Sequence, residues 1–396
     1  MQYIIFFCTI KKTVIFLRSI GDVEMLQKFM VKGFKNFASK IEFDLTSGNY
    51  TFNDEIIQSN IINTAVVYGD NASGKSNLGL AIMDIITHLT DNEKNIDDYK
   101  KHFLNLETIP EFAEFKYTFN FNDHIVEYNY CKREYNVILY EELFIDDELI
   151  VKYDRQKQIK TINLKNGGEL NFEKLRDDQS LVKLAYVYTT GGNQEEDQKD
   201  AIFDRFIKFV DSMLSFDSIY GNHYQGYTTG RGTIAEMIIE KDKVKEYQQF
   251  LSDLDINYEL FEKEIDGSKS IFAKFRSGKE ADFFNIMSKG TLSLSLFFMW
   301  YMQIVDGIQF VFIDEFDSYF HHKVSRKLIN KLKSSPIQVI LTTHNTANMS
   351  NLILRPDSYF TISRGTIANI AARSGREIRQ AQNIEKMYRA GSFDNE

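Results

Sequence analysis

Residues 69–76 of this chain are Gly69-Asp70-Asn71-Ala72-Ser73-Gly74-Lys75-Ser76, and they fit the phosphate-binding pattern G-x-x-x-x-G-K-[ST] at every fixed position. The preceding residues, 64–68, are an apolar run rich in β-branched side chains, which predicts a buried strand. The following residues, 77–86, have the composition of a helix. Between a strand and a helix, the backbone N–H groups of such a loop and the helix N-terminus both attract phosphate. We therefore predict that this loop, together with Asn77, binds a nucleotide.

The last two residues of the loop have separate predicted roles. We expect the ammonium group of Lys75 to hold the β- and γ-phosphates of ATP, and the hydroxyl group of Ser76 to complete the coordination shell of Mg²⁺. The alternative is a glycine-rich turn that carries a lysine by coincidence. The predicted strand and helix on either side disfavour that alternative.

Composition places the chain among folded globular proteins. Its 396 residues are 43% hydrophobic and include only 3 prolines, so we expect about two domains or lobes with a large core. A net charge of −9 disfavours a uniformly basic surface, although a local basic stripe stays compatible with it. The two cysteines, Cys8 and Cys131, lack the spacing of a metal site and favour a reducing, cytoplasmic location.

The first 24 residues differ from the rest. Two apolar segments there are separated by Lys11-Lys12, so neither reaches the roughly 18 residues that a membrane span requires. The unbroken apolar core of a secretory signal is not evident either. We expect residues 1–24 to be an upstream extension, and we predict no membrane association.

The middle of the chain alternates in the manner of strands. Residues 28–45 predict two strands ahead of the phosphate loop, and residues 114–130 begin a meander with one buried face. Apolar residues at helical spacing then predict helices over 200–216 and 233–254. The aromatic residues of the meander could stack on nucleic-acid bases, but a sheet core is the more common cause of such a pattern.

Two further apolar runs end in side chains suited to nucleotide chemistry. Residues 310–313 lead into Asp314 and Glu315, and we expect Asp314 to reach the metal and Glu315 to polarise the attacking water. Such acid–base assistance is typically worth about 10²- to 10⁴-fold in rate. Residues 338–343 lead into His344, which can hydrogen-bond a γ-phosphate. The order of the motifs disfavours the alternative of a histidine that only caps a turn.

A second segment that is suited to binding an anion precedes Asp314 in the sequence. Ser288 and Gly290 stand at the start of a predicted apolar helix, and a helix N-terminus attracts anions. Two such anion-binding segments of one chain rarely contact the same phosphate group. We therefore expect Ser288 and Gly290 to contact a nucleotide that is held by another copy of the chain.

In this order, the motifs resemble those of ABC-type ATPases of the SMC/RecF/OLD-like branch. The similar segments are the phosphate loop at Gly69–Ser76, a signature at Ser288–Thr291, metal-binding acids at Asp314-Glu315, a D-loop at Asp317-Ser318 and a switch histidine at His344. Residues 31–37 and 384–393 also resemble short, arm-less ATPases of bacterial abortive-infection and phage-defence operons. Lys289 and Thr291 depart from the family signature, where glycine and glutamine are usual, and we assign no Q-loop glutamine.

The resemblance implies an α/β fold, with an ABC-ATPase-like P-loop core whose mixed sheet is flanked by helices and interrupted by an inserted α+β lobe. The expected parts are the extension 1–24, the first part of the core 25–98, the inserted lobe 99–280, the second part of the core 281–363 and a tail 364–396. Residues 100–280 themselves resemble no family that we can name.

The resemblance also implies that two copies enclose two ATP molecules, so that ATP closes a homodimer and hydrolysis opens it. The leading hypothesis is an ATPase switch of this kind that controls a separate effector, a nuclease or a toxin, in antiphage defence. The first alternative is a RecF/SMC-like repair ATPase that binds DNA, supported by five basic residues and no acid within 323–333. The second alternative is a scaffold that binds ATP without turnover.

Overall fold

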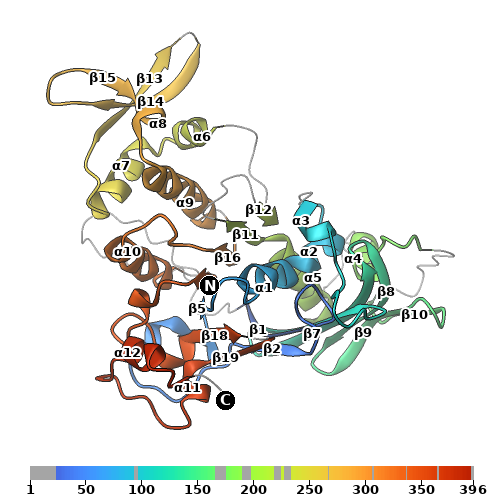
Figure 1. The fold of residues 1–396 in the computed structure, drawn as a ribbon. Coiled ribbons are helices and arrows are strands. Elements are labelled where there is room, and N and C mark those ends of the chain that lie inside the picture. The colour runs from blue at the N-terminus through green and yellow to red at the C-terminus, as the bar shows by residue number, and fades with distance from the viewer. Residues whose placement is uncertain are drawn as a thin grey trace, which may run out of the picture.

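Figure 1 shows the fold in a computed structural model, which describes residues 24–92, 97–165, 175–189, 198–217, 224–226, 233–265, 267–305, 307–335, 337–363 and 365–393. The predicted N-terminal extension lies outside these residues, except for its last residue, Glu24. That residue begins the first strand.

A seven-stranded sheet forms the centre of the fold. Its order is β12 (Tyr224–Gly226), β11 (Met213–Asp217), β16 (Phe310–Asp314), β17 (Gln338–Thr343), β5 (Thr64–Tyr68), β18 (Tyr359–Ser363) and β19 (Thr366–Asn369). The five inner strands are parallel, and the two edge strands are antiparallel to their neighbours. Strands β5 and β17 are buried along their whole length, as is usual where both faces of a parallel sheet are covered. The predicted α/β fold with a mixed central sheet is confirmed.

A second seven-stranded sheet is antiparallel throughout. Its order is β10 (Ile159–Ile162), β9 (Glu148–Asp154), β8 (Val137–Ile145), β7 (His124–Glu134), β6 (Ala113–Phe121), β1 (Glu24–Lys32) and β2 (Ile41–Asp44). The alternating aromatic residues Phe115, Tyr117 and Phe119 of β6 are buried. They pack in the sheet core, so the stacking-platform alternative is wrong for these three side chains.

The remaining elements include a separate three-stranded sheet, β13-β14-β15, and the helices (Figure 1). The short strands are β3 (Ile57–Gln58), β4 (Ile61–Ile62), β13 (Glu259–Ile265), β14 (Ser268–Lys274) and β15 (Glu280–Asp282). The helices are α1 (Lys75–Ile82), α2 (Ile86–Leu89), α3 (Asp97–Lys100), α4 (Leu181–Thr189), α5 (Gln198–Asp211), α6 (Ile234–Glu240), α7 (Val244–Asp253), α8 (Phe283–Ile286), α9 (Lys289–Val305), α10 (His322–Lys333), α11 (Ile370–Arg373) and α12 (Ile384–Arg389). In the described part of the chain, no helix is both long and apolar enough to cross a bilayer.

Two hydrophobic cores cover opposite faces of the central sheet. The first contains helix α1 and the inner face of the antiparallel sheet, and Phe312 of β16 points into it. The second contains helices α9 and α10, and the next residue of the strand, Ile313, points into it. Helix α1 lies very close to β16, because a Cβ atom at Gly79 would be 2.4 Å from the Phe312 ring. This close approach places the start of α1 beside the end of β16.

The segment predicted as a single inserted lobe, 99–280, does not form one unit. Strands β6 to β10 extend the sheet that β1 and β2 begin, whereas β11 joins the central sheet beside β16. Only the later part, from α6 to β15, stands apart from both large sheets (Figure 1). The sequence could not show this division, because strand pairing between distant segments leaves no local pattern.

The predicted helices in this segment also have different ends. The helix predicted over 200–216 ends at Asp211 and gives way to strand β11. A short apolar run such as Met213–Phe216 fits a helix or a strand equally well by periodicity alone. The helix predicted over 233–254 divides into α6 and α7, and Asp242 between them has a left-handed φ of 52°.

Candidate functional site

The predicted phosphate loop connects β5 to α1 in a conformation that requires small residues. Gly74 has a φ of 106°, and a Cβ atom there would be 2.4 Å from the side-chain nitrogen Nδ2 of Asn36. A Cβ atom at Gly69 would be 2.4 Å from Ser73 Oγ and 2.7 Å from the carbonyl oxygen of Ile362. Ser73 Oγ is buried and has no hydrogen-bond partner within the described chain. A tight backbone cradle with an unsatisfied hydroxyl group fits a bound phosphate.

Lys75 joins this cradle to the end of strand β16. Its side chain is only 5% exposed, and its Nζ atom donates to the carbonyl oxygens of Gly69 at 2.9 Å and Asp70 at 3.2 Å. The same atom lies 3.4 Å from Glu315 Oε1. Two of the predicted catalytic side chains, which are 240 positions apart in sequence, are therefore in direct contact.

Glu315 also contacts the predicted switch histidine. Its Oε2 atom is 3.0 Å from His344 Nδ1, and the His344 side chain is 58% exposed. Glu315 has a left-handed φ of 46°, and its backbone N–H donates to Thr342 Oγ1 at 2.9 Å. Non-glycine residues in this conformation cost about 1–3 kcal/mol and concentrate at functional sites. The turn directs the carboxylate between Lys75 and His344.

Asp314 lies next to the start of α1. Its carboxylate accepts a hydrogen bond from Thr342 Oγ1 at 2.5 Å and another from the hydroxyl group of Ser76. Burial raises the pKa of the Asp314 carboxyl group above its ordinary value, whereas the hydrogen bonds from Ser76 and Thr342 oppose the rise and the negative charges of Asp217 and Glu315 add to it. The two predicted metal-binding side chains, Ser76 and Asp314, are thus brought together.

These residues suit Mg²⁺ held jointly with a nucleotide. Among the described residues, no group of three or more His, Cys, Asp and Glu side chains forms a metal site by itself. Mg²⁺ usually takes one or two carboxylates from the protein and fills its shell with phosphate oxygens and water. The pair Ser76 and Asp314 beside the phosphate loop has that character.

The D-loop residue Asp317 holds the switch segment in place. It is 4% exposed, and it accepts hydrogen bonds from Thr343 Oγ1 at 2.6 Å, Asn345 Nδ2 at 3.1 Å and Asn348 Nδ2 at 2.8 Å. These three donors flank His344 on both sides. Asp317 therefore fixes the backbone that carries the histidine.

The predicted signature makes its described contacts with the first turn of α9 and with Tyr319. Ser288 Oγ accepts from the backbone N–H of Thr291 at 3.1 Å, so that it caps α9. A Cβ atom at Gly290 would lie 3.1 Å from the carbonyl oxygen of Tyr319, and Ser288 and Lys289 are exposed. Within the described residues, no hydrogen bond or ion pair joins this signature to residues 69–76. The contact of Ser288 and Gly290 with a nucleotide of another copy stays a prediction.

The sequence analysis missed two side chains that approach the site. Asn36 accepts a hydrogen bond from Asn77 Nδ2 at 2.7 Å and donates one to the carbonyl oxygen of Ser73 at 3.5 Å, so it braces the phosphate loop from the β1–β2 turn. Asp217 ends strand β11 in register with Asp314. The sequence does contain a signal for Asp217, because residues 213–216 form a mostly apolar run that ends in an acid, as residues 310–313 do.

A phosphate loop, a strand ending in two acids and a switch histidine meet at the carboxyl edge of a parallel sheet. This arrangement defines a P-loop ATPase core of the ABC type. Residues 65–350 match the family described as "AAA domain, putative AbiEii toxin, Type IV TA system". The match spans more than half of the chain, and the chain belongs to this family. No curated protein sequence matches the chain.

Several solved structures have a similar course of the chain. The SMC head domain from Thermotoga maritima aligns with a TM-score of 0.42 and 16% identity, over 87% of this chain and 97% of that one. An SMC head domain from Pyrococcus yayanosii aligns with a TM-score of 0.44 and 11% identity, over 93% of this chain and 100% of that one. The recombination mediator protein RecF with ATP aligns with a TM-score of 0.38 and 12% identity, over 88% of this chain and 99% of that one. The family assignment rests on the match to residues 65–350.

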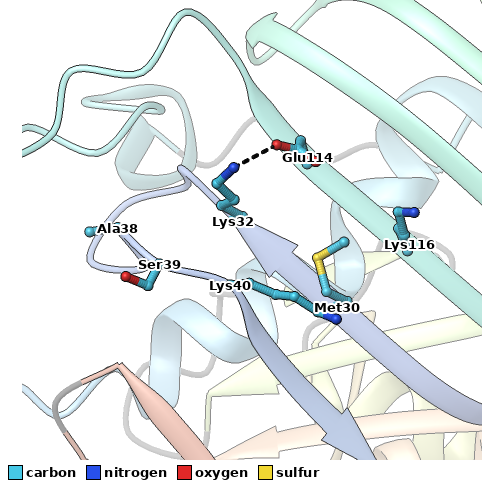
Figure 2. Close-up of a pocket in the computed structure, with 7 residues that line it drawn as sticks. All are labelled: Met30, Lys32, Ala38, Ser39, Lys40, Glu114 and Lys116. Carbon is cyan, nitrogen blue, oxygen red and sulfur yellow. Dashed lines mark hydrogen bonds and ion pairs between the residues drawn. The ribbon is translucent and has the colours of Figure 1, made fainter.

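Figure 2 shows a pocket at β1, β6 and the turn that follows β1. It has a volume of about 450 Å³ and is lined by Met30, Lys32, Ala38, Ser39, Lys40, Glu114 and Lys116. Lys32 pairs with Glu114 at 3.1 Å, and Lys40 pairs with Glu42 at 3.0 Å. Because acids neutralise two of its three lysines, the pocket has only a weak positive charge.

The basic segment 323–333 is mostly paired as well. It lies in helix α10, where Lys327 contacts Asp255 at 2.8 Å and Lys333 contacts Glu55 at 2.9 Å. Lys331 lies 3.8 Å from Asp253, and Arg326 donates to the carbonyl oxygen of Ala347 at 2.6 Å. These contacts reduce the positive charge that the sequence offered to DNA.

Proposed function

We propose that this chain binds ATP with Mg²⁺, hydrolyses it, and uses the hydrolysis as a switch between a closed homodimer and an open state. The observation that carries the proposal is the continuous contact from Lys75 through Glu315 to His344. It joins the phosphate loop, the acidic strand end and the switch segment, which are three distant parts of the sequence.

The residues have the following proposed roles. The loop from Gly69 to Ser76 binds the phosphates, and Lys75 turns from the loop carbonyls toward the β- and γ-phosphates. Glu315 orients a water molecule and accepts its proton, and His344 holds the Glu315 carboxylate and the γ-phosphate side of the site. Ser76 and Asp314 hold Mg²⁺, which supplies charge stabilisation for the phosphoryl group when it is bound.

The exposed position of the signature supports the proposed dimerisation. Ser288 and Lys289 are exposed at the N-terminus of α9, which is 17 residues long. The positive end of this helix dipole is available to a phosphate that a second copy presents. ATP bound between the copies would favour the closed state. Only in that state do the phosphate loop of one copy and the N-terminus of α9 in the other both contact the same nucleotide.

We extend the proposal to a separate effector, a nuclease or a toxin, in cytoplasmic antiphage defence. The family description names a toxin and a type IV TA system. This description supports a role for the chain beside a second, separate protein.

Measurements on the purified chain test the central proposal. We expect Mg²⁺-dependent ATPase activity in the wild type, its loss in Glu315→Gln, and loss of nucleotide binding in Lys75→Ala. Light scattering with ATP should show a dimer that is most persistent in Glu315→Gln. An inactive wild type that still binds ATP would instead support the scaffold alternative.

The DNA-binding alternative differs in one measurable property. A repair ATPase should bind DNA with an affinity that falls steeply as the salt concentration rises. The ion pairs of Lys327 and Lys333 disfavour this outcome. A gel-shift titration at two salt concentrations, with and without ATP, distinguishes the two functions.

A further inference from the structure

Residues 384–393 form the last described part of the chain, and the proposed function assigns them no role. They fold into the short helix α12 and the turn that ends it. Gly391, just after the helix, has a left-handed φ of 74°. Its N–H group donates to the carbonyl oxygen of Tyr388 at 2.9 Å, and the N–H group of the next residue donates to that of Met387 at 3.0 Å. This pair of hydrogen bonds is the Schellman motif, which closes a helix at a defined residue.

Two buried side chains attach this segment to the second hydrophobic core. Ile384 and Phe393 are each 1% exposed and belong to the core that also contains helix α10. Asn351 holds the residues before α12, because its Nδ2 group donates to the carbonyl oxygens of Arg379 at 3.1 Å and Gln382 at 3.2 Å. Packing on both sides thus fixes the position of α12, and its polar side chains contact defined places.

Helix α12 contacts the switch segment through Arg389. The Nε and Nη2 atoms of Arg389 donate to Thr346 Oγ1 at 3.2 Å and 3.1 Å. The same guanidinium group lies 2.8 Å from Glu385, one turn earlier in the helix, and an i,i+4 ion pair in this order stabilises a helix. Glu385 also accepts from the Thr346 hydroxyl group at 3.5 Å. Thr346 follows His344 by two residues and begins the turn 346–348, so these contacts hold the chain just beyond the histidine.

The preceding residue of α12 contacts the strand that leads into the phosphate loop. The Tyr388 ring packs against the ring of Tyr68, with centroids 6.1 Å apart and planes 50° apart. Tyr68 is fully buried, ends strand β5 and directly precedes Gly69 of the loop. Helix α12 therefore joins the start of the phosphate loop to the switch segment by a route that does not pass through Lys75 and Glu315.

We infer that Arg389 is a positioning residue for ATP hydrolysis, which acts through Thr346 to hold the His344 turn at a fixed place relative to the phosphate loop. The inference rests on the proposed function, because it concerns the same switch histidine. Asp317 holds this turn from inside the molecule, whereas Arg389 holds it from the surface, where its side chain is 65% exposed. In the described chain Arg389 has no hydrogen bond or ion pair to residues 69–76, so its loss should lower kcat and leave the affinity for ATP unchanged.

A double-mutant cycle on kcat tests the inference. Arg389→Ala and Thr346→Val should each lower kcat about 3- to 10-fold, with the KM for ATP within about twofold of the wild type. Because both changes remove the same contact, the double variant should be no slower than the slower single variant. Arg389→Lys keeps the charge and should recover part of the rate. Arg376→Ala removes another exposed arginine, whose side chain has no hydrogen bond or ion pair within the described residues, and should leave kcat unchanged.

A His344→Ala background separates positioning of the histidine from a general loss of stability. If Arg389 acts through His344, Arg389→Ala should lower kcat by less than about twofold in that background. Hydrogen exchange without ATP gives a second readout, and the amides of residues 344–348 should exchange about 3- to 10-fold faster in Arg389→Ala.

Three results would refute the inference for a folded Arg389→Ala variant: a wild-type kcat, an effect on kcat that is undiminished in the His344→Ala background, or wild-type exchange of these amides. The proposed function can fail separately. A wild type without ATPase activity overturns the proposed function and the inference together, whereas an active wild type with an unaffected Arg389→Ala variant overturns the inference alone.

Discussion

The switch segment should depend on Asp317 more than on any contact of His344 itself. Replacing Asp317 by alanine removes the acceptor of three side-chain hydrogen bonds, from Thr343, Asn345 and Asn348. Thr343 and Asn348 are fully buried. A buried donor without a partner costs about 1–3 kcal/mol, so two of them cost about 2–6 kcal/mol.

Part of this loss is offset. Burial raises the pKa of the Asp317 carboxyl group, which shows that its desolvation is unfavourable, and the alanine variant no longer bears that desolvation. We expect the free energy of unfolding to fall by a net amount of about 2–4 kcal/mol. Urea unfolding followed by circular dichroism measures this change.

Two variants serve as controls. Asp317→Asn keeps one oxygen atom that can accept a hydrogen bond. Its new NH₂ group, however, would face the NH₂ groups of Asn345 and Asn348, and donors do not bond to donors. The stability of this variant should therefore lie between those of the wild type and Asp317→Ala. Glu240→Ala changes an exposed helix end and should stay within about 0.5 kcal/mol of the wild type.

The functional consequence is separable from stability. At a temperature where Asp317→Ala is folded, its ATPase rate should be low although it retains His344 and Glu315, and its affinity for ATP should be close to that of the wild type. A variant with wild-type stability and wild-type ATPase rate would refute the assignment of Asp317 as the anchor of the switch segment.

Three further predictions concern other parts of the molecule. Glu315→Gln should lower the ATPase rate constant about 10²- to 10⁴-fold and lengthen the lifetime of the ATP-bound dimer; a rate within tenfold of the wild type would contradict the role of Glu315. Gly79→Ala should lower stability by about 1–3 kcal/mol, because the added Cβ would be 2.4 Å from the Phe312 ring, and adding Phe312→Leu should recover part of the loss in a thermal melt. Burial raises the pKa of the Cys131 thiol to about 12, so in a Cys8→Ser background it should react with a disulfide reagent at pH 8 only after unfolding; fast labelling of the native protein would show that the thiol is accessible.

Sequence patterns alone identified the residues whose spacing is dictated by phosphate chemistry. The loop Gly69–Ser76 requires its glycines and its lysine within eight positions, and the structure shows why at Gly69 and Gly74, where a Cβ atom would collide with neighbouring atoms. Asp314-Glu315 and His344 were predicted because each follows an apolar run that is long enough for a buried strand. Glu315 contacts both Lys75 and His344, while the catalytic roles of these residues stay proposals.

The residues that support this site could not be found in the same way. Asp217 follows a run that resembles the end of a helix as much as a strand, and only the pairing of β11 with β16 gives it a partner in Asp314. Asp317 was expected as part of a D-loop, but its three donors come from residues 26 to 31 positions later in the chain. The inserted lobe was misjudged for the same reason, since β6 pairs with β1 across some eighty residues.

The sequence by itself determined the phosphate loop, the acidic strand end and the central α/β sheet, because these depend on short-range spacing and on continuous burial of a strand. Only the tertiary structure decided which strand lies beside β16, where the aromatic meander packs, and that Gly290 lies close to Tyr319. Those features depend on pairing and packing between distant segments, whose free energy is distributed over many contacts and leaves no pattern in any single stretch of residues.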